Sequence, residues 1–170
     1  IDHEYGGFMC NADRDGTQIS SIKNTWYEGR GIWVYSVLYN NFGHNPKYLE
    51  VARKSVDFIL KHKPAGDGLW PGGYSKEGLA QGELDSRGYG DLFIASGLAE
   101  YAKASGKNEY WEMAREIMMK IIRLYDRHDY YPNAARDYLG QDAPLFPGVR
   151  VSGVWMVLIN LATGMLEYKT

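Results

Sequence analysis

Hydrophobic positions along this chain follow two kinds of helical pattern. In residues 47–62 and again in residues 109–127, apolar side chains recur three or four positions apart and charged side chains fill the remaining positions. This spacing is typical of a helix with one covered face. Residues 30–42, 90–104 and 153–168 are instead apolar nearly all round, as in helices that are buried on several sides. The order along the chain therefore predicts inner, outer, inner, outer and inner helices.

A weak internal repeat indicates stacked helical hairpins. Residues 43–52 resemble residues 106–114, because each segment contains a Gly that ends one helix and leads into the next outer helix. Such repeats are typical of solenoids and α/α toroids. Gly-rich segments at 5–18 and 68–85 have strand character and predict short hairpins at one end of the helices. Residues 128–150 predict a further loop there, and clustered loops often carry sites.

The bulk properties narrow the class of protein. A chain of 170 residues suits one domain, and its net charge of −2 argues against a nucleic-acid partner. The single Cys10 excludes an internal disulfide and favours a reducing compartment, so we expect a cytoplasmic protein. The longest apolar run, Gly153 to Leu166, is too short to span a membrane and predicts a buried helix. Because the chain lacks an initial Met, we expect it to start inside a longer protein.

Aromatic side chains are numerous, with fourteen Tyr and five Trp. Flat rings with a polar edge suit a sugar or another polyhydroxyl ligand, which offers C–H faces for stacking and hydroxyls for hydrogen bonds. The same rings could simply fill a core. Composition alone leaves both interpretations open.

Arg30 is the most informative charged residue. The positions three, four and seven residues after it are Trp33, Val34 and Val37, so Arg30 opens the stripe that a helix would turn toward the protein interior. A buried charge requires either an ionic partner or a functional role. Two interpretations follow: Arg30 pairs with Glu28 or another carboxylate, or it binds a ligand in a site.

Several motifs do not support a metal or nucleotide site. Residues 11–17 match the opening of a calcium loop, but Ile22 stands where a bidentate Glu is required, so we expect an Asx-type turn. Residues 87–91 lack the third Gly of a dinucleotide loop, since Phe93 occupies that position. No two histidines have the helical spacing of zinc ligands, and only His128 remains as a pocket candidate. We therefore expect no bound metal.

Asp91 is the carboxylate with the most suggestive position. It begins an inner helix beside Tyr89, in a place analogous to that of Arg30. It could line a pocket, or it could complement the positive end of the helix dipole. The sequence allows both.

Together these residues resemble the N-acylglucosamine 2-epimerase family over essentially the whole chain. The resemblance is most specific around Gly29-Arg30 and Trp33. It is supported by the following segments: Gly6-Gly7-Phe8, Asp15-Gly16-Thr17, Gly88-Tyr89-Gly90-Asp91, Leu98–Gly106 and Trp155–Leu161. The resemblance implies an all-α (α/α)₆ barrel with short β-hairpins at one end. Residues 1–170 would form the N-terminal part of a single barrel domain, about half of it.

The resemblance also implies an activity. Enzymes of the family epimerise sugars at C2, or isomerise aldoses to ketoses, by removing and returning the proton alpha to the carbonyl of the ring-opened sugar. Arg30 matches the family's pocket arginine and would be catalytic, binding the O1/O2 region or stabilising developing negative charge. Trp33, Tyr89 and Asp91 fall at or beside substrate-binding positions.

Two departures bear on the branch of the family. Val157 and Asn160 stand where cellobiose and mannose epimerases of the superfamily carry His and Glu, which favours the N-acylglucosamine branch. The family's remaining histidines would lie beyond Thr170, so the acid and base are expected outside this chain, which would be inactive alone. We expect no cofactor, although the resemblance allows a nucleotide effector. The chain could form a homodimer or associate with the remaining half of the barrel.

Two other functions remain open. A glycoside hydrolase on the same barrel would require two carboxylates across the pocket, and Asp91 alone is insufficient. A non-catalytic helical repeat could instead bind carbohydrate or a protein partner at its aromatic end.

Overall fold

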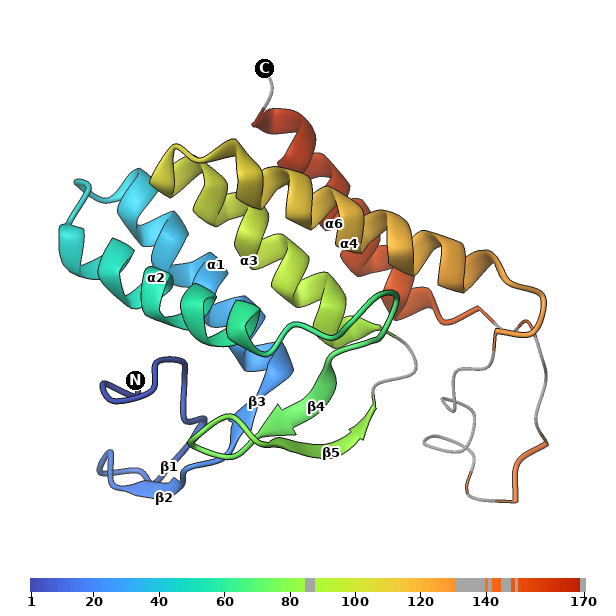
Figure 1. Cartoon of the computed structure of the whole chain (residues 1–170), viewed down its shortest axis with the longest axis horizontal. Coiled ribbons are helices and arrows are strands. Elements are labelled where there is room, and N and C mark those ends of the chain that lie inside the picture. The colour runs from blue at the N-terminus through green and yellow to red at the C-terminus, as the bar shows by residue number, and fades with distance from the viewer. Residues whose placement is uncertain (85–87, 131–139, 141, 145–147, 149, 169–170) are drawn as a thin grey trace.

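The computed structural model describes residues 1–84, 88–130, 140, 142–144, 148 and 150–168. Its helices are α1 (Thr25–Asn41), α2 (Pro46–Lys61), α3 (Tyr89–Ser105), α4 (Asn108–Asp126) and α6 (Ser152–Glu167). Its strands are β1 (Asn11–Ala12), β2 (Gln18–Ser20), β3 (Lys23–Asn24), β4 (Pro71–Tyr74) and β5 (Ala80–Leu84). Figure 1 shows the helices stacked above the strands.

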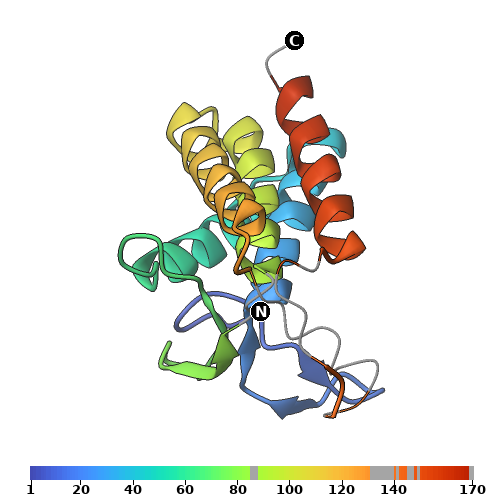
Figure 2. The ribbon, with the colours of Figure 1, turned by 90° about the vertical axis from the view of Figure 1, so that its right-hand side faces the viewer.

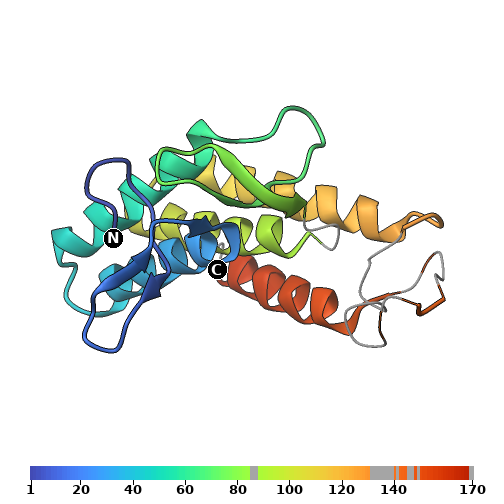
Figure 3. The same ribbon diagram turned by 90° about the horizontal axis from the view of Figure 1, so that it is seen from below.

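The helices are arranged in an inner and an outer set. Helices α1, α3 and α6 lie side by side, while α2 packs on α1 and α4 packs on α3. Figures 2 and 3 show α6 on one side of the α1–α3 pair and the two outer helices on the other. The predicted alternation of inner and outer helices is therefore confirmed.

The outer helices follow their amphipathic patterns closely. Helix α2 buries Ala52, Val56 and Ile59, and helix α4 buries Ile117 and Ile121. These side chains join one hydrophobic core with residues of α3 and α6. The bounds of both helices agree with the prediction to within one residue. The spacing of the apolar residues also predicts correctly which face of each helix is covered.

Helix α1 begins earlier than predicted, at Thr25 rather than at residue 30. The Asn24 side chain caps it by accepting a hydrogen bond of 2.9 Å from the Trp26 backbone N–H. Gly29 and Gly31 lie inside the helix at places of close approach. A Cβ at Gly29 would collide with the backbone of α3, and a Cβ at Gly31 would collide with the Phe8 ring. These glycines therefore mark contacts rather than the start of the helix.

The strands form two small sheets at one end of the helices. Strands β1 and β2 pair antiparallel, and the Asp15 carboxylate accepts from the Thr17 N–H in the turn between them. This confirms the predicted Asx-type turn, although the hairpin spans residues 11–20 rather than 5–18. Strand β3 joins the predicted β4–β5 hairpin as a third strand, with Lys23 opposite Tyr74. A two-residue strand carries too little pattern to be recognised from sequence.

Residues 1–8 form no strand and instead wrap across the base of α1 and α2. Buried Asp2 forms an ion pair of 2.9 Å with buried Lys23, whose ammonium group also donates to the Lys76 carbonyl oxygen. The Phe58 ring lies 4.1 Å from the same ammonium group. These contacts hold the N-terminal segment and the three-stranded sheet together beneath the helices.

The predicted loop at 128–150 lies partly outside the described residues. His128 is described and is exposed, and it does not line the cavity identified below. No helix in the described part of the chain is long and apolar enough to cross a membrane.

Candidate functional site

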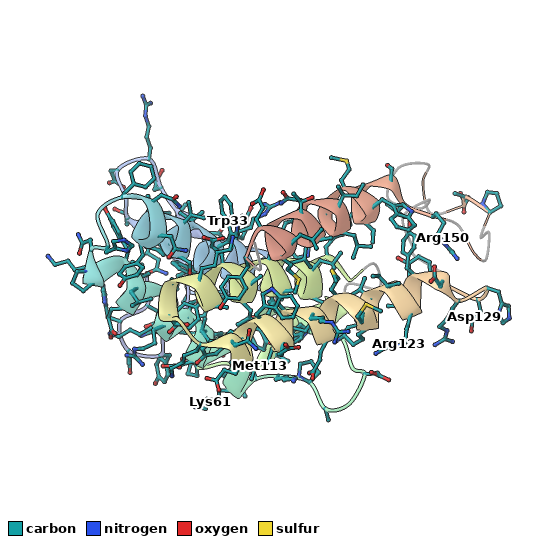
Figure 4. The ribbon with its side chains drawn as sticks, turned by 90° about the horizontal axis from the view of Figure 1, so that it is seen from above. Trp33, Lys61, Met113, Arg123, Asp129 and Arg150 are labelled. Carbon is teal, nitrogen blue, oxygen red and sulfur yellow. The ribbon has the colours of Figure 1, made fainter. Side chains whose placement is uncertain are left out.

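A cavity of about 540 Å³ opens between the three inner helices. Its walls come from one face of each helix. The lining residues are Gly29, Arg30, Trp33 and Val34 of α1, Phe93 and Ser96 of α3, and Met156, Val157 and Asn160 of α6. In Figure 4, Trp33 lies beside α6, on the opposite side of α3 from Met113 of α4. Arg30 and Trp33 therefore meet in one cavity, as the sequence pattern suggested.

The stripe that begins at Arg30 is not buried in the packed core. Arg30 is exposed, and Trp33 and Val34 are each 43% exposed. This corrects the expectation that the stripe turns inward. It faces the open side of α1, while Gly29, Ile32 and Ser36 face the core.

Helix α6 shows the same division between a covered and an open face. Its Val154 and Leu158 are buried, whereas Met156 and Ile159 are 70% and 64% exposed. The prediction that this apolar helix is buried all round is therefore wrong for the described chain. Its apolar residues therefore lie on two faces of the helix, one packed against the core and one on the open side of the cavity.

Arg30 makes no ion pair with any residue that the structure describes. Its guanidinium carbon lies 4.2 Å from the centroid of the Phe93 ring. The alternative of a pair with Glu28 is also wrong, because that carboxylate points elsewhere. Glu28 is fully buried and accepts hydrogen bonds from the Phe8 N–H at 2.7 Å and the Ser55 hydroxyl at 2.6 Å.

Burial without a direct cationic partner changes the acidity of Glu28. Loss of hydration raises the pKa of this carboxyl to about 7, while its hydrogen bonds and the more distant Lys23 act in the opposite direction. A carboxylate and a guanidinium two residues apart on α1 therefore occupy separate environments. Glu28 ties the N-terminal segment to α1 and α2, and Arg30 faces the cavity.

Tyr89 lies beside the cavity rather than in its wall. Its ring packs against Trp26 at 5.2 Å and Phe93 at 6.5 Å between centroids. Its hydroxyl reaches the start of α6, where a Cβ at Gly153 would collide with it. Tyr89 thus supports the aromatic wall, and its predicted contact with substrate stays a prediction.

Asp91 is not brought to the cavity. It is 1% exposed and accepts hydrogen bonds from the Lys120 ammonium group and, at 3.1 Å, from the Trp70 N–H. A desolvated carboxylate requires such partners, and Lys120 supplies the opposite charge from α4. The structure gives Asp91 the role of an anchor between α3, α4 and the segment before β4.

Seven of the lining residues were not among the predicted site residues: Gly29, Val34, Phe93, Ser96, Met156, Val157 and Asn160. A signal for two of them was present, because Phe93 and Ser96 follow Tyr89 at helical spacing on the same face. A second cavity of about 180 Å³ shares Trp33, Ser96 and Asn160 with the first. These three side chains therefore line both cavities.

Among the described residues, no three metal-ligating side chains gather into a cluster. The first cavity instead combines apolar and aromatic walls with one guanidinium and two neutral polar side chains, those of Ser96 and Asn160. Such walls suit a small molecule with C–H faces and hydroxyls. Paired inner and outer helices with this cavity on the inner face are the arrangement found in the (α/α)₆-barrel class of proteins, and the described helices would form part of such a barrel.

Within that class, the sequence profile of N-acylglucosamine 2-epimerase (GlcNAc 2-epimerase) matches residues 6–150. The chain belongs to the N-acylglucosamine 2-epimerase family. The predicted resemblance is therefore confirmed.

Individual relatives support this assignment. The chain is 25% identical to N-acylglucosamine 2-epimerase of Bos taurus and 28% identical to that of Rattus norvegicus, in each case over 98% of this chain and 39% of the relative. Among solved structures, cellobiose 2-epimerase from Spirochaeta thermophila is similar with a TM-score of 0.74 at 20% identity, over 98% of this chain and 43% of that one. A sugar epimerase from a ruminal bacterium gives a TM-score of 0.75 at 18% identity, over 96% of this chain and 44% of that one. The chain thus spans about two fifths of the length of these relatives.

Proposed function

We propose that the full-length protein containing this chain interconverts sugars at C2, as a 2-epimerase or an aldose–ketose isomerase. The observation that carries the proposal is the guanidinium of Arg30, which faces an aromatic-walled cavity without a carboxylate partner in the described chain. Membership of the N-acylglucosamine 2-epimerase family supports the choice of reaction.

The proposed chemistry is proton transfer next to a carbonyl. A base removes the C2 proton of the ring-opened sugar, and negative charge develops on the oxygens of the resulting enediolate. Arg30 would stabilise this charge, since a positioned cation contributes most where charge appears in the transition state. Return of a proton to the opposite face of C2 inverts the centre, and no redox cofactor is required.

The remaining walls would orient the sugar. Trp33 offers a ring face to the C–H groups of the substrate, and Ser96 and Asn160 offer hydrogen bonds to its hydroxyls. Met156 and Val157 form an apolar surface on α6. That surface suits the methyl group of an N-acyl substituent, so we propose an N-acylhexosamine as the preferred substrate class.

The acid and base are proposed to come from outside residues 1–170. Among the described residues that line the cavity, none is a His, Asp, Glu, Lys or Tyr. These are the side chains that usually transfer protons near neutral pH. The expectation that this chain alone is inactive therefore remains part of the proposal.

The alternatives have less support. A glycoside hydrolase requires two carboxylates at the scissile bond, whereas the described lining has none and Asp91 is held by Lys120. A non-catalytic protein would bind carbohydrate in the same cavity without exchanging the C2 proton of the sugar.

The experiment incubates the full-length protein in D₂O with N-acetylglucosamine, N-acetylmannosamine, mannose and cellobiose, and follows the C2 proton by NMR. Deuterium at C2 together with formation of the epimer would establish proton-transfer epimerisation and identify the sugar. Binding of a sugar without exchange would favour the non-catalytic role. Release of monosaccharides from cellobiose would favour a hydrolase.

A further inference from the structure

We propose that Phe93 is a positioning residue for Arg30, whose guanidinium it holds at the cavity by stacking while leaving the positive charge un-neutralised. The inference rests on the proposed function and adds a residue to it. It concerns the link between α1 and α3, because Arg30 and Phe93 come from different helices.

The contact is close and has no ionic competitor in the described chain. The Arg30 guanidinium carbon lies 4.2 Å from the Phe93 ring centroid, well inside the range of a cation–π interaction. Arg30 is exposed, so its long side chain would otherwise sample many rotamers. A planar guanidinium stacked on a ring loses this freedom and keeps its N–H donors free at the edge.

The Phe93 ring is itself fixed. Trp26 packs against it at 5.8 Å and Tyr89 at 6.5 Å between ring centroids. The backbone of Phe93 touches α1 directly, since a Cβ at Gly29 would collide with the Phe93 carbonyl group. Gly29 precedes Arg30, so the close approach of the two helices also sets the cation opposite the ring.

Arg53, which is held by carboxylates, shows how a ring differs from a carboxylate as a partner. Arg53 is held by Glu50 and Asp57 on the outer surface, with N···O distances of 2.8 and 2.6 Å. A carboxylate paired with Arg30 would neutralise the positive charge on which the proposed enediolate stabilisation depends. The quadrupole of a ring attracts the cation without supplying a counter-ion. Stacking thus positions Arg30 and preserves its charge.

The first test is spectroscopic and needs no substrate. In the full-length protein labelled with ¹⁵N-arginine, the Nε–H signal of Arg30 is assigned by its loss in Arg30→Lys. We expect this signal to be shifted upfield by the ring current of Phe93, to move toward the random-coil position in Phe93→Leu, and to stay shifted in Phe93→Tyr. The matched control is Phe42→Leu, since Phe42 is 66% exposed at the end of α1 and lies outside the cavity lining. An Arg30 signal that is the same in wild type and Phe93→Leu would overturn the inference.

The second test separates positioning of Arg30 from direct contact between Phe93 and the sugar. For Phe93→Leu we expect kcat to fall roughly 3- to 30-fold, in line with the strength of a cation–π contact, with a smaller change in KM. In an Arg30→Ala background the same substitution should have almost no effect on kcat, because the two residues act together. Equal effects in both backgrounds would contradict the inference. If the protein epimerises no sugar, the proposed function fails, while the spectroscopic test still decides the inference about Phe93.

Discussion

Glu28 and Arg30 lie two residues apart on α1 and show how helical geometry separates opposite charges. Glu28 points toward Phe8 and Ser55 and is fully buried, whereas Arg30 points toward the cavity. Neither side chain forms an ion pair with a residue that the structure describes. The carboxyl accepts hydrogen bonds that join three segments. The guanidinium lines the cavity and lies over the Phe93 ring.

The buried carboxyl predicts a distinct pH dependence of stability. The pKa of Glu28 is raised to about 7 in the folded protein from a usual value near 4.5, so the folded state binds more protons between these values. This group therefore favours folding most at acidic pH, and its contribution falls as pH rises toward 7. The groups that face it are the Ser55 hydroxyl, the Phe8 N–H and, farther away, the Lys23 ammonium.

The measurement is the free energy of unfolding from pH 5 to pH 8 for wild type and Glu28→Gln. We expect wild type to lose up to about 3 kcal/mol relative to the variant across this interval. The neutral amide cannot titrate, so the difference isolates the carboxyl. Parallel curves for the two proteins would show that Glu28 has an ordinary pKa.

The ion pair between Asp91 and Lys120 predicts a structural role for both residues. Because Asp91 is 1% and Lys120 12% exposed, Lys120→Met leaves a buried carboxylate without its cation, and we expect a loss of about 3 kcal/mol or more in the free energy of unfolding. The matched control is Lys54→Met, whose exposed pair with Glu50 should contribute less than about 1 kcal/mol. Denaturant titration measures both.

Asp91→Asn distinguishes the anchor from a substrate-binding residue. We expect lower stability and an unchanged affinity for sugar at a temperature where the variant is folded. Isothermal titration calorimetry measures the affinity. Weakened sugar binding with unchanged stability would restore the role predicted from the sequence.

At the scale of elements, the contact between α1 and α3 depends on two facing glycines. A Cβ at Gly97 would lie 2.6 Å from the Gly29 carbonyl oxygen and 2.9 Å from the Cβ of Ile32. We expect Gly97→Ala to lower the free energy of unfolding by about 1–3 kcal/mol, since the helices must separate. Gly164→Ala on α6 meets no atom within 4 Å and should instead stabilise the protein by up to about 1 kcal/mol. A stabilising Gly97→Ala would show that the two helices are not in backbone contact.

The sequence predicts elements best where the pattern is local. The outer helices were predictable to within one residue, because alternating apolar and charged faces specify both their length and orientation. Strand β3 was not, since Lys23 and Asn24 become a strand only through pairing with β4. Arg30 and Trp33 were predictable as neighbours by helical spacing. The partner of Asp91 was not, because Lys120 is distant in the chain and belongs to another helix.

At the scale of the whole molecule, the inner helices leave an apolar face uncovered. On α6, Met156, Ile159 and Leu166 are 70%, 64% and 72% exposed, and Trp33 of α1 adds to the same open side. Apolar patches of this kind are usually covered in soluble proteins. The relatives, with more than twice the length of this chain, have additional chain that could cover such a face.

This face predicts poor behaviour of residues 1–170 produced alone. We expect the isolated chain to self-associate and to bind a hydrophobic dye, and we expect Ile159→Lys to weaken both effects. The full-length protein should show neither. Analytical ultracentrifugation and dye fluorescence measure these properties. A cooperatively melting monomer of residues 1–170 that binds no dye would contradict the expectation.

In the proposed reaction, a sugar exchanges its C2 proton in the cavity that Arg30 faces. The most direct measurement is the rate of deuterium incorporation at C2 of N-acetylmannosamine in D₂O, for the full-length wild type, Arg30→Ala and Arg123→Ala. Arg123 lies on outer helix α4, away from this cavity, and serves as the matched control (Figure 4). We predict a loss of roughly 100-fold or more for Arg30→Ala and no change for Arg123→Ala. Equal rates of incorporation in wild type and Arg30→Ala would contradict the proposed role of Arg30.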